Sequence, residues 1–291
     1  SRCTRLVGGD GVKKCLHCDG SGYNPKRLVS EEECLYCDGQ GLVEATVMYH
    51  DIKNCTALVG LKGVADNTID VIFTSPPYNL KNSTGNGMKN GKGGKWEGNA
   101  LEVGAYDNYD DNMPRDLYVK WQREVIAECF RVLKPTGVLY YHHKFRVQGG
   151  LMQGHDEILD GFNVRQMIIW SRSGGINFNK GYFLPTYEVI YMMPKTAKGK
   201  DAFKLQPKTN AYGDVWQVHQ ETKNPHPAPW PLELPRRILT SSTYTGDVGI
   251  CLDPFAGSGG LAVVAEELGW NSISIEQSSE YCDMIRERLE E

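Results

Sequence analysis

Residues 249–276 read GICLDPFAGSGGLAVVAEELGWNSISIE, and this stretch decides the fold. An apolar run, GICLD, leads into a glycine-bearing loop, and a second apolar run, SISIE, ends on Glu276 after a segment with helical spacing. A strand, a tight loop, a helix and a strand in that order predict one unit of a parallel sheet. Gly257 and Gly259 let the backbone pass close to a ligand where the helix begins.

The same alternation extends over most of the chain. Further strands are predicted over 68–74, 138–142, 166–170 and 188–193, and further helices over 117–133, 232–239 and 281–289. We therefore expect an α/β fold with a mostly parallel sheet, in which ligands lie beyond the carboxyl ends of the strands. The sequence Lys-Pro-Thr-Gly at 134–137 predicts a stop between a helix and the next strand.

A second strand end is unusual. Residues 73–79 read FTSPPYN and follow a buried-looking run. Each proline fixes φ near −65° and lacks an N–H, so Pro76 and Pro77 make a stiff corner. When this stretch is considered by itself, an ordinary turn at the end of a strand is as good an interpretation as a functional corner.

Four segments occur in a telling order: TSPPYN (74–79), NPHPAPWPLELP (224–235), DPFAGSG (253–259) and SISIE (272–276). Together they resemble the amino-methylating DNA methyltransferases, in the order of the β class. The resemblance covers residues 46–291 and implies a Rossmann-like methyltransferase fold. It also implies S-adenosylmethionine as the methyl donor and site-specific transfer to the exocyclic amino group of a flipped base in DNA.

The resemblance implies a cofactor site by matched position. Asp253, Phe255, Gly257 and Gly259 correspond to the methionine-binding loop, and Glu276 to the ribose anchor. Further candidates are His226 and Pro227, which cover the methionine end, and Asp51, an acid before the SPPY strand. The chain has Gly260-Leu261 where the family usually has Thr-Thr; the backbone donors remain.

The SPPY corner suits the chemistry of an amino group. Its lone pair is conjugated into the ring, so acceptors must grip the amino hydrogens and free the lone pair to attack the methyl group in line. Ser75 Oγ and the carbonyl of Pro76 are such acceptors, and the two prolines hold that carbonyl still. Tyr78 offers a ring for stacking on the flipped base. This mechanism does not require a cysteine that forms a covalent bond to the base.

The identity of the base is left open. Serine at the first position favours cytosine N4, whereas aspartate is common in adenine N6 enzymes, and serine occurs with both. Methylation of RNA or of a protein amide, instead of DNA, is a further alternative. A zinc-containing DNA-binding protein without activity is a rival of a different class, although the intact SPPY and GSG loops argue against it.

Two basic segments are candidates for DNA contact. Loop 79–96 holds four lysines, five glycines and no acid, and we expect it to meet DNA phosphates rather than to be an idle surface loop. Region 145–222 is the expected target-recognition region. Its candidate phosphate or guanine contacts are Arg172, Lys180, Lys195, Lys198, Lys200, Lys204 and Lys208. His142 and His143 follow a strand end and are predicted to be structural.

The N-terminal residues 1–45 contain an internal repeat, CLHCDGSG (15–22) and CLYCDGQG (34–41). Cys15, Cys18, Cys34 and Cys37 have the spacing of a closed four-thiolate zinc site, and the repeat resembles DnaJ-type zinc modules. We expect structural zinc in a small module that stabilises the fold; a DNA-contacting finger is the alternative. The main domain would span residues 46–291.

The composition of the chain limits its possible partners and its compartment. The formal charge of −4 gives no global signal for nucleic acid, but residues 144–223 carry +4 and residues 247–291 carry −8, which allows an anionic polymer on one face. No apolar run has the length of a membrane span. Paired C-x-x-C cysteines favour a reducing cytoplasm, of a bacterium or a phage-infected cell. A homodimer and a cognate restriction endonuclease are left open.

Overall fold

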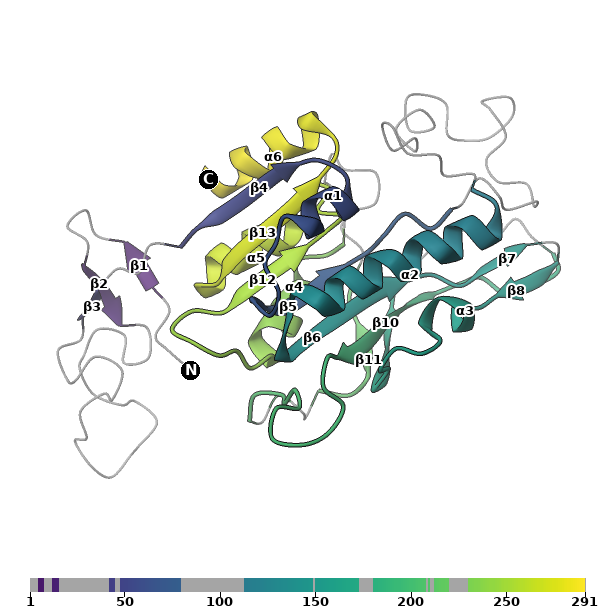
Figure 1. Cartoon of the computed structure of the whole chain (residues 1–291), viewed down its shortest axis with the longest axis horizontal. Helices are drawn as coiled ribbons and strands as arrows, with labels where there is room; N and C mark the ends of the chain where they lie inside the picture. Colours follow the sequence, from purple (N-terminus) through teal and green to yellow (C-terminus); the bar gives the residue numbers. More distant parts are fainter. Residues whose placement is uncertain are drawn as a thin grey trace.

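An eight-stranded sheet forms the centre of the structure, a computed structural model (Figure 1). The structure describes residues 5–7, 12–15, 42–44, 48–79, 113–148, 150–172, 180–207, 209, 212–219 and 230–290, the first three segments by backbone alone. The strands of the sheet are β4 (His50–Asn54), β5 (Ile69–Thr74), β6 (Leu133–His143), β9 (Gln166–Ser171), β10 (Tyr187–Pro194), β11 (Val215–Gln217), β12 (Ile250–Asp253) and β13 (Asn271–Glu276). Their order across the sheet is β11-β9-β10-β6-β5-β12-β13-β4.

One strand of this sheet runs against the others. β10 is antiparallel to both β6 and β9, and all other neighbouring pairs are parallel. The prediction of a mostly parallel sheet is confirmed. Because β10 is reversed, its first residues lie at the edge where the parallel strands end.

Helices cover the sheet on both faces (Figure 1). They are α1 (Ala57–Lys62), α2 (Arg115–Val132), α3 (Asp156–Leu159), α4 (Glu233–Ser241), α5 (Gly260–Leu268) and α6 (Ser279–Glu290). Apolar side chains of α1, α2 and α3 belong to one core and those of α4 and α5 to a second, while Ala262 of α5 and Ile285 of α6 belong to a smaller third cluster. The neighbours Tyr140 and Tyr141 on β6 point into opposite cores, as the alternation of a strand requires.

Smaller elements complete the described chain. β7 (Arg146–Gln148) and β8 (Leu151–Gln153) form an antiparallel hairpin, and β1 (Arg5–Val7), β2 (Val12–Cys15) and β3 (Leu42–Glu44) form a separate three-stranded sheet. The predicted strands and helices are present, with ends shifted by a few residues. The elements that were not predicted are β1, β2, β3, β4, β7, β8, β11, α1 and α3.

The Lys-Pro-Thr-Gly segment is the main difference from the predicted elements. The helix stops at Val132 as expected, but the segment lies inside β6, which already begins at Leu133. Its pairing with β5 shifts register between Ile69 and Val71, so the extra residues form a bulge. A Cβ at Gly137 would lie 3.0 Å from two carbonyl oxygens of β5, which explains the glycine there.

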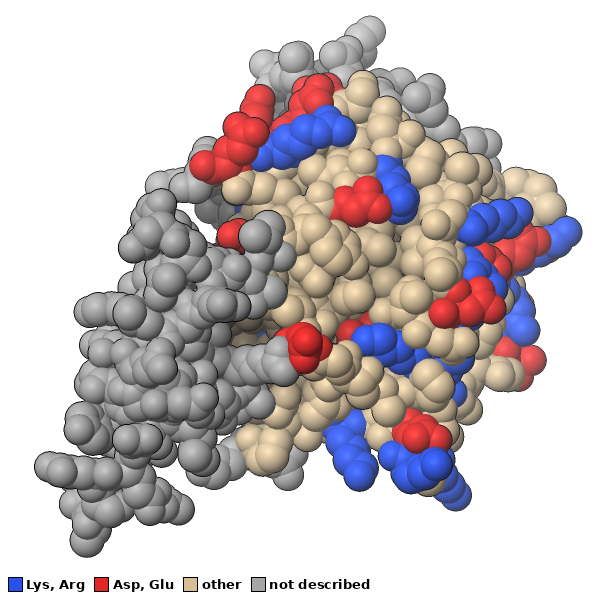
Figure 2. All heavy atoms as spheres, turned by 60° about the vertical axis from the view of Figure 1, so that its left-hand side comes forward, with Lys and Arg blue, Asp and Glu red and all other residues tan. Residues whose placement is uncertain are grey.

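Charges are mixed on the described surface. Figure 2 shows acidic and basic side chains side by side over one face, around an uncharged centre. None of the helices in the described segments is long and apolar enough to cross a bilayer.

Candidate active site

Two loops that are distant in the sequence meet at the carboxyl edge of the sheet. β5 ends at Thr74 and β12 ends at Asp253, and these two strands are parallel neighbours. The hydroxyl of Thr74 donates to Asp253 Oδ1 at 2.7 Å, and the Phe255 N–H donates to the same oxygen at 2.9 Å. The bond from Thr74 joins the strand that ends in SPPY to the strand that ends in DPFAGSG.

Asp253 is almost fully buried in this arrangement, at 1% exposure. Burial raises the pKa of its carboxyl from 3.8 to about 7, although the bonds from Phe255 and Thr74 act in the opposite direction.

The loop after β12 has the backbone geometry for which glycine is needed. Gly257 and Gly259 have φ of +50° and +78°, in the left-handed region. A Cβ at Gly259 would lie 2.7 Å from the Ile285 side chain, so α6 also excludes a larger residue. α5 starts directly after this loop, so its first N–H groups face the same edge.

Glu276 ends β13 beside this loop. Its two carboxylate oxygens accept hydrogen bonds from the Gly257 N–H at 2.8 Å and the Ser278 N–H at 2.9 Å. Burial raises the pKa of the carboxyl, and the backbone donors oppose the rise. The glycine loop, the helix end and an oriented carboxylate together form a cradle that fits an adenosine-containing cofactor.

The SPPY corner brings two hydroxyls together. Ser75 Oγ and Tyr78 Oη are 2.7 Å apart. The Tyr78 ring packs against the His143 ring with centroids 4.8 Å apart and an angle of 30°. Behind it, the ring centroids of His143 and His155 are 4.1 Å apart and those of His155 and Phe145 are 4.6 Å apart, so four rings in mutual contact, two of the pairs tilted, form one stack. The stack fixes one face of Tyr78 against the protein.

A buried hydrogen-bond chain holds the second proline. The Tyr118 hydroxyl donates to the Pro77 carbonyl at 2.9 Å and lies 2.8 Å from His143 Nε2. His143 Nδ1 accepts from the Lys144 N–H at 2.8 Å, so Nε2 carries the hydrogen and donates to Tyr118. Burial keeps the pKa of His143 well below its usual value, so the ring is neutral. His143 thus has the structural role that the sequence predicted.

Asn79 closes the corner, and the sequence reasoning missed it. It is fully buried with φ of +57°, and its side chain donates to the Met113 carbonyl and accepts from the Met113 N–H, both at 2.8 Å. Arg146 donates to the carbonyls of Tyr78 and Asn79. Asparagine is among the few residues that adopt a positive φ readily, which was the available signal.

Glu188 is a second residue that was missed. It lies near the start of β10 at 7% exposure, and the reversal of that strand brings it to the active edge. Its carboxylate lies 3.1 Å from His142 Nε2, 3.4 Å from Arg172 Nη1 and 3.8 Å from Lys144 Nζ. Burial alone raises the pKa of Glu188, but these neighbours outweigh it and lower the pKa to about 2. An acid at the head of the apolar run EVIYMM was the signal in the sequence.

Asp51 is not brought to this edge. It pairs with Ile273, three positions before the Asn54–Glu276 pair at the strand ends, and its carboxylate lies 2.7 Å from Lys53 Nζ. Asn54 instead reaches the site, because its side chain donates to the Glu276 carbonyl at 3.1 Å. The matched acid before the SPPY strand is therefore a surface ion-pair partner here.

Several predicted residues lie outside the described part of the chain. These are His226, Pro227, Cys18, Cys34, Cys37, Lys208 and all of loop 79–96 except Asn79, while Cys15 ends β2 with no side chain described. Within the described residues, no group of His, Cys, Asp and Glu could hold a metal ion.

The basic residues of region 145–222 differ in their surroundings. Arg172 lies in the Glu188 cluster, whereas Lys180, Lys198, Lys200 and Lys204 are exposed. Lys195 is used within the fold, since its ammonium donates to Asn67 Oδ1 at 2.7 Å and to the Leu133 carbonyl at 2.6 Å.

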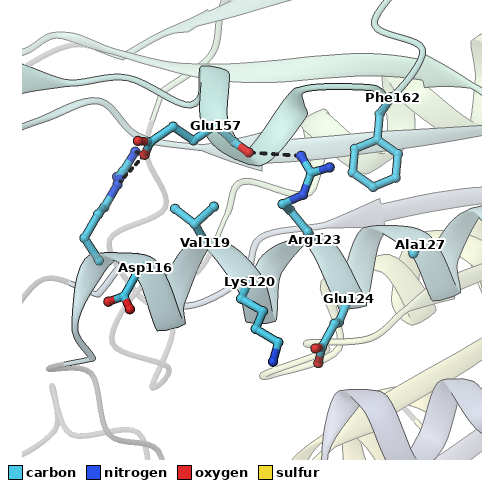
Figure 3. A pocket seen from close by; sticks show the side chains of 9 residues that line it. Asp116, Val119, Lys120, Arg123, Glu124, Ala127, Glu157 and Phe162 are labelled. Atoms are coloured by element: carbon cyan, nitrogen blue, oxygen red, sulfur yellow. Dashed lines mark hydrogen bonds and ion pairs between the residues drawn. The ribbon is translucent and has the colours of Figure 1, made fainter.

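A groove between α2 and α3 shares no lining residue with this edge (Figure 3). Its arginines serve the fold: Arg123 donates to carbonyls at the end of α3, and Arg115 pairs with Glu157 at 2.8 Å. The arginines of the groove therefore hold α3 against α2, and no ligand is needed to explain them.

Known proteins with similar sequences are DNA methyltransferases. A family model for DNA methylases of the N6/N4 type matches residues 69–287. The type II methyltransferase M.HpaI of Haemophilus parainfluenzae is 32% identical over 252 residues, covering 80% of this chain and 72% of the relative. The DNA adenine methyltransferase YhdJ of Escherichia coli K12 is 31% identical over 265 residues, covering 80% of each chain.

A solved structure shares the fold. TTHA0409 of Thermus thermophilus, solved in complex with S-adenosyl-L-methionine, superposes with a TM-score of 0.57 at 22% identity. The match covers 82% of this chain and 93% of that chain, and it supports the Rossmann-like assignment.

Proposed function

We propose that this chain, which belongs to the N6/N4 family of DNA methylases, methylates cytosine N4 in DNA. It is a DNA methyltransferase that uses S-adenosylmethionine. The observation that carries the choice of site is the bond between Thr74 and Asp253, because it places the SPPY corner beside the glycine loop. Methyl donor and target base need this proximity.

The cofactor is assigned to the cradle after β12. S-adenosylmethionine supplies a methyl group activated by its sulfonium. We assign Asp253, Phe255, Gly257 and Gly259 to its methionine end and Glu276 to its ribose, where a carboxylate fixed by two N–H donors accepts from hydroxyls. His226 and Pro227 stay proposed contacts at the methionine end.

The base is assigned to the SPPY corner. Ser75 Oγ and the Pro76 carbonyl accept the two amino hydrogens, and Pro77 is held still by Tyr118. Tyr78 stacks on the base with the ring face opposite His143. Burial raises the pKa of Cys251, the cysteine on β12, so a thiolate nucleophile does not fit.

Cytosine is favoured over adenine by Ser75, which takes the position where adenine enzymes commonly have aspartate. Adenine N6 is the second candidate, since the E. coli relative is named as an adenine methyltransferase. The test is to incubate the protein with S-adenosylmethionine and mixed-sequence DNA, digest the DNA to nucleosides and separate them by mass spectrometry. N4-methylcytosine supports the proposal, and N6-methyladenine rejects the base while keeping the clamp.

The DNA surface is assigned to loop 79–96 and region 145–222, with Lys180, Lys198, Lys200 and Lys204 as exposed candidates. Charge-reversal variants of these lysines should weaken DNA binding and reduce its salt dependence, while cofactor affinity holds. A homodimer and a cognate endonuclease would be tested by sedimentation and by restriction assays.

We also propose that residues 1–45 bind one structural zinc through Cys15, Cys18, Cys34 and Cys37. The proposal rests on the repeated C-x-x-C-D-G-x-G pattern alone. Elemental analysis of purified protein should find one zinc per chain, and Cys34→Ser should lose it. Lower melting temperature in that variant indicates a stabilising module, and unchanged melting with weaker DNA binding indicates a finger.

A further inference from the structure

Glu188 and His142 are linked to Ser75 through one hydroxyl. Tyr78 Oη lies 2.7 Å from Ser75 Oγ, 3.3 Å from His142 Nδ1 and 3.5 Å from Glu188 Oε2. His142 Nε2 lies 3.1 Å from the same carboxylate but out of line for a hydrogen bond, and it has no other partner among the described residues. Hydroxyl, imidazole and carboxylate thus form one buried group behind the serine.

The direction of the hydrogen bonds in this group depends on the His142 tautomer. Glu188 is ionised between Arg172 and Lys144, so it only accepts. If the ring hydrogen of His142 is on Nε2, facing Glu188, its Nδ1 accepts from the Tyr78 hydroxyl. If Nδ1 carries the hydrogen, Tyr78 Oη accepts from it, and the Tyr78 hydrogen goes either to Glu188 Oε2 at 3.5 Å or to Ser75 Oγ at 2.7 Å. The first arrangement is the one in which the Tyr78 hydrogen points at this pair and Tyr78 Oη accepts from Ser75.

This direction matters for an amino substrate. An exocyclic amino group presents hydrogens to the clamp, so Ser75 must offer a lone pair. A serine hydroxyl that rotates freely would also point its hydrogen at the substrate. Fixing that hydrogen on Tyr78 removes the unproductive orientation before the base arrives.

We infer that Glu188 and His142 are positioning residues that turn the Ser75 hydroxyl into an acceptor by holding the hydrogen of Tyr78. The inference rests on the proposed role of Ser75 in gripping the amino group. It gives His142 a task beyond the structural one predicted from the sequence, and it gives Glu188 a reason to be buried at the active edge.

The test is a double-mutant cycle on turnover. Glu188→Gln and Tyr78→Phe are each expected to lower kcat about tenfold, the scale of one hydrogen bond. The double variant should be no slower than Tyr78→Phe alone, because both act through the same hydroxyl. Cofactor and DNA affinities, measured separately, should stay unchanged in all three.

Three results would overturn the inference: unchanged kcat in Glu188→Gln, losses that multiply in the double variant, or a loss confined to DNA affinity. Ser75→Ala separates this inference from the clamp. If Ser75→Ala is active, the clamp itself is wrong; if it is inactive while Glu188→Gln is fully active, only the positioning role is wrong. Should Glu188→Gln melt below the assay temperature, His142→Asn replaces it with the same expected pattern.

Discussion

Thr74 and Asp253 are 179 residues apart in the chain, and the hydroxyl of one donates to the buried carboxylate of the other at 2.7 Å. Each residue is the last of its strand. The bond therefore fixes the distance between the corner assigned to the base and the loop assigned to the cofactor. Methyl transfer depends on that distance, since a displacement of about 1 Å is enough to cost ~100-fold in rate.

Thr74→Val tests this link with little change in shape. The variant removes the hydroxyl and leaves Asp253 Oδ1 with the Phe255 N–H as its remaining donor among the residues that the structure describes. We expect the free energy of unfolding to fall by about 1–3 kcal/mol and cofactor binding to weaken. Urea unfolding and calorimetry with S-adenosylmethionine measure both. Thr74→Ser keeps the donor and is the control; a loss in Thr74→Ser with none in Thr74→Val would mean that methyl packing, not the bond, matters.

Asp253 should make the stability of the protein depend on pH. Burial raises the pKa of its carboxyl from 3.8 to about 7, so the folded protein binds this proton more tightly than the unfolded chain. Its contribution is fully present below about pH 4 and is lost as the pH rises through 7, at ~1.4 kcal/mol per pH unit. Asp253→Asn should flatten this slope in urea unfolding between about pH 4 and 7. An unchanged slope in the variant would assign the dependence to other groups.

Ser75 and Tyr78 should affect turnover without affecting the cofactor. Ser75→Ala removes one acceptor of the amino group and should lower kcat by about 10²–10³. Tyr78→Ala removes the stacking ring and should also lower turnover strongly. The affinity for S-adenosylmethionine should hold in both, because neither residue belongs to the cradle around Glu276. Single-turnover kinetics beside calorimetry check this, and near-full activity in either variant contradicts the clamp.

The sequence predicted the residues whose roles are local. A strand that ends in SPPY and another that runs into DPFAGSG are apolar runs with turn residues after them, and both lie where expected. Glu276 was located for the same reason, as the last residue of an apolar run.

The residues that were missed depend on pairing between distant segments. Glu188 reaches the active edge only because β10 is antiparallel, and strand direction is not written in the residues 187–194. The bulge in β6 likewise depends on its register with β5, which let Lys-Pro-Thr-Gly sit inside a strand. Asp51 matched the family only by its position in the sequence. In the sheet, its residue pair lies three pairs before the one at the end of the strand.

Asn79 gives the sharpest stability test, because three of its properties are used at once. Its backbone is left-handed with φ of +57°, its amide donates to the Met113 carbonyl, and its side-chain oxygen accepts from the Met113 N–H. Asn79→Asp keeps the shape but sets a carboxylate oxygen against a carbonyl, and we expect a loss of about 2 kcal/mol or more in urea unfolding.

Asn79→Gly separates the backbone from the side chain. Glycine adopts the positive φ without cost, so this variant loses only the two hydrogen bonds. Asn79→Ala loses the bonds and also strains the backbone, by about 1 kcal/mol more. The expected order of stability is wild type, then Gly, then Ala. Should Ala prove as stable as Gly, the left-handed backbone would not be what selects asparagine after the SPPY corner.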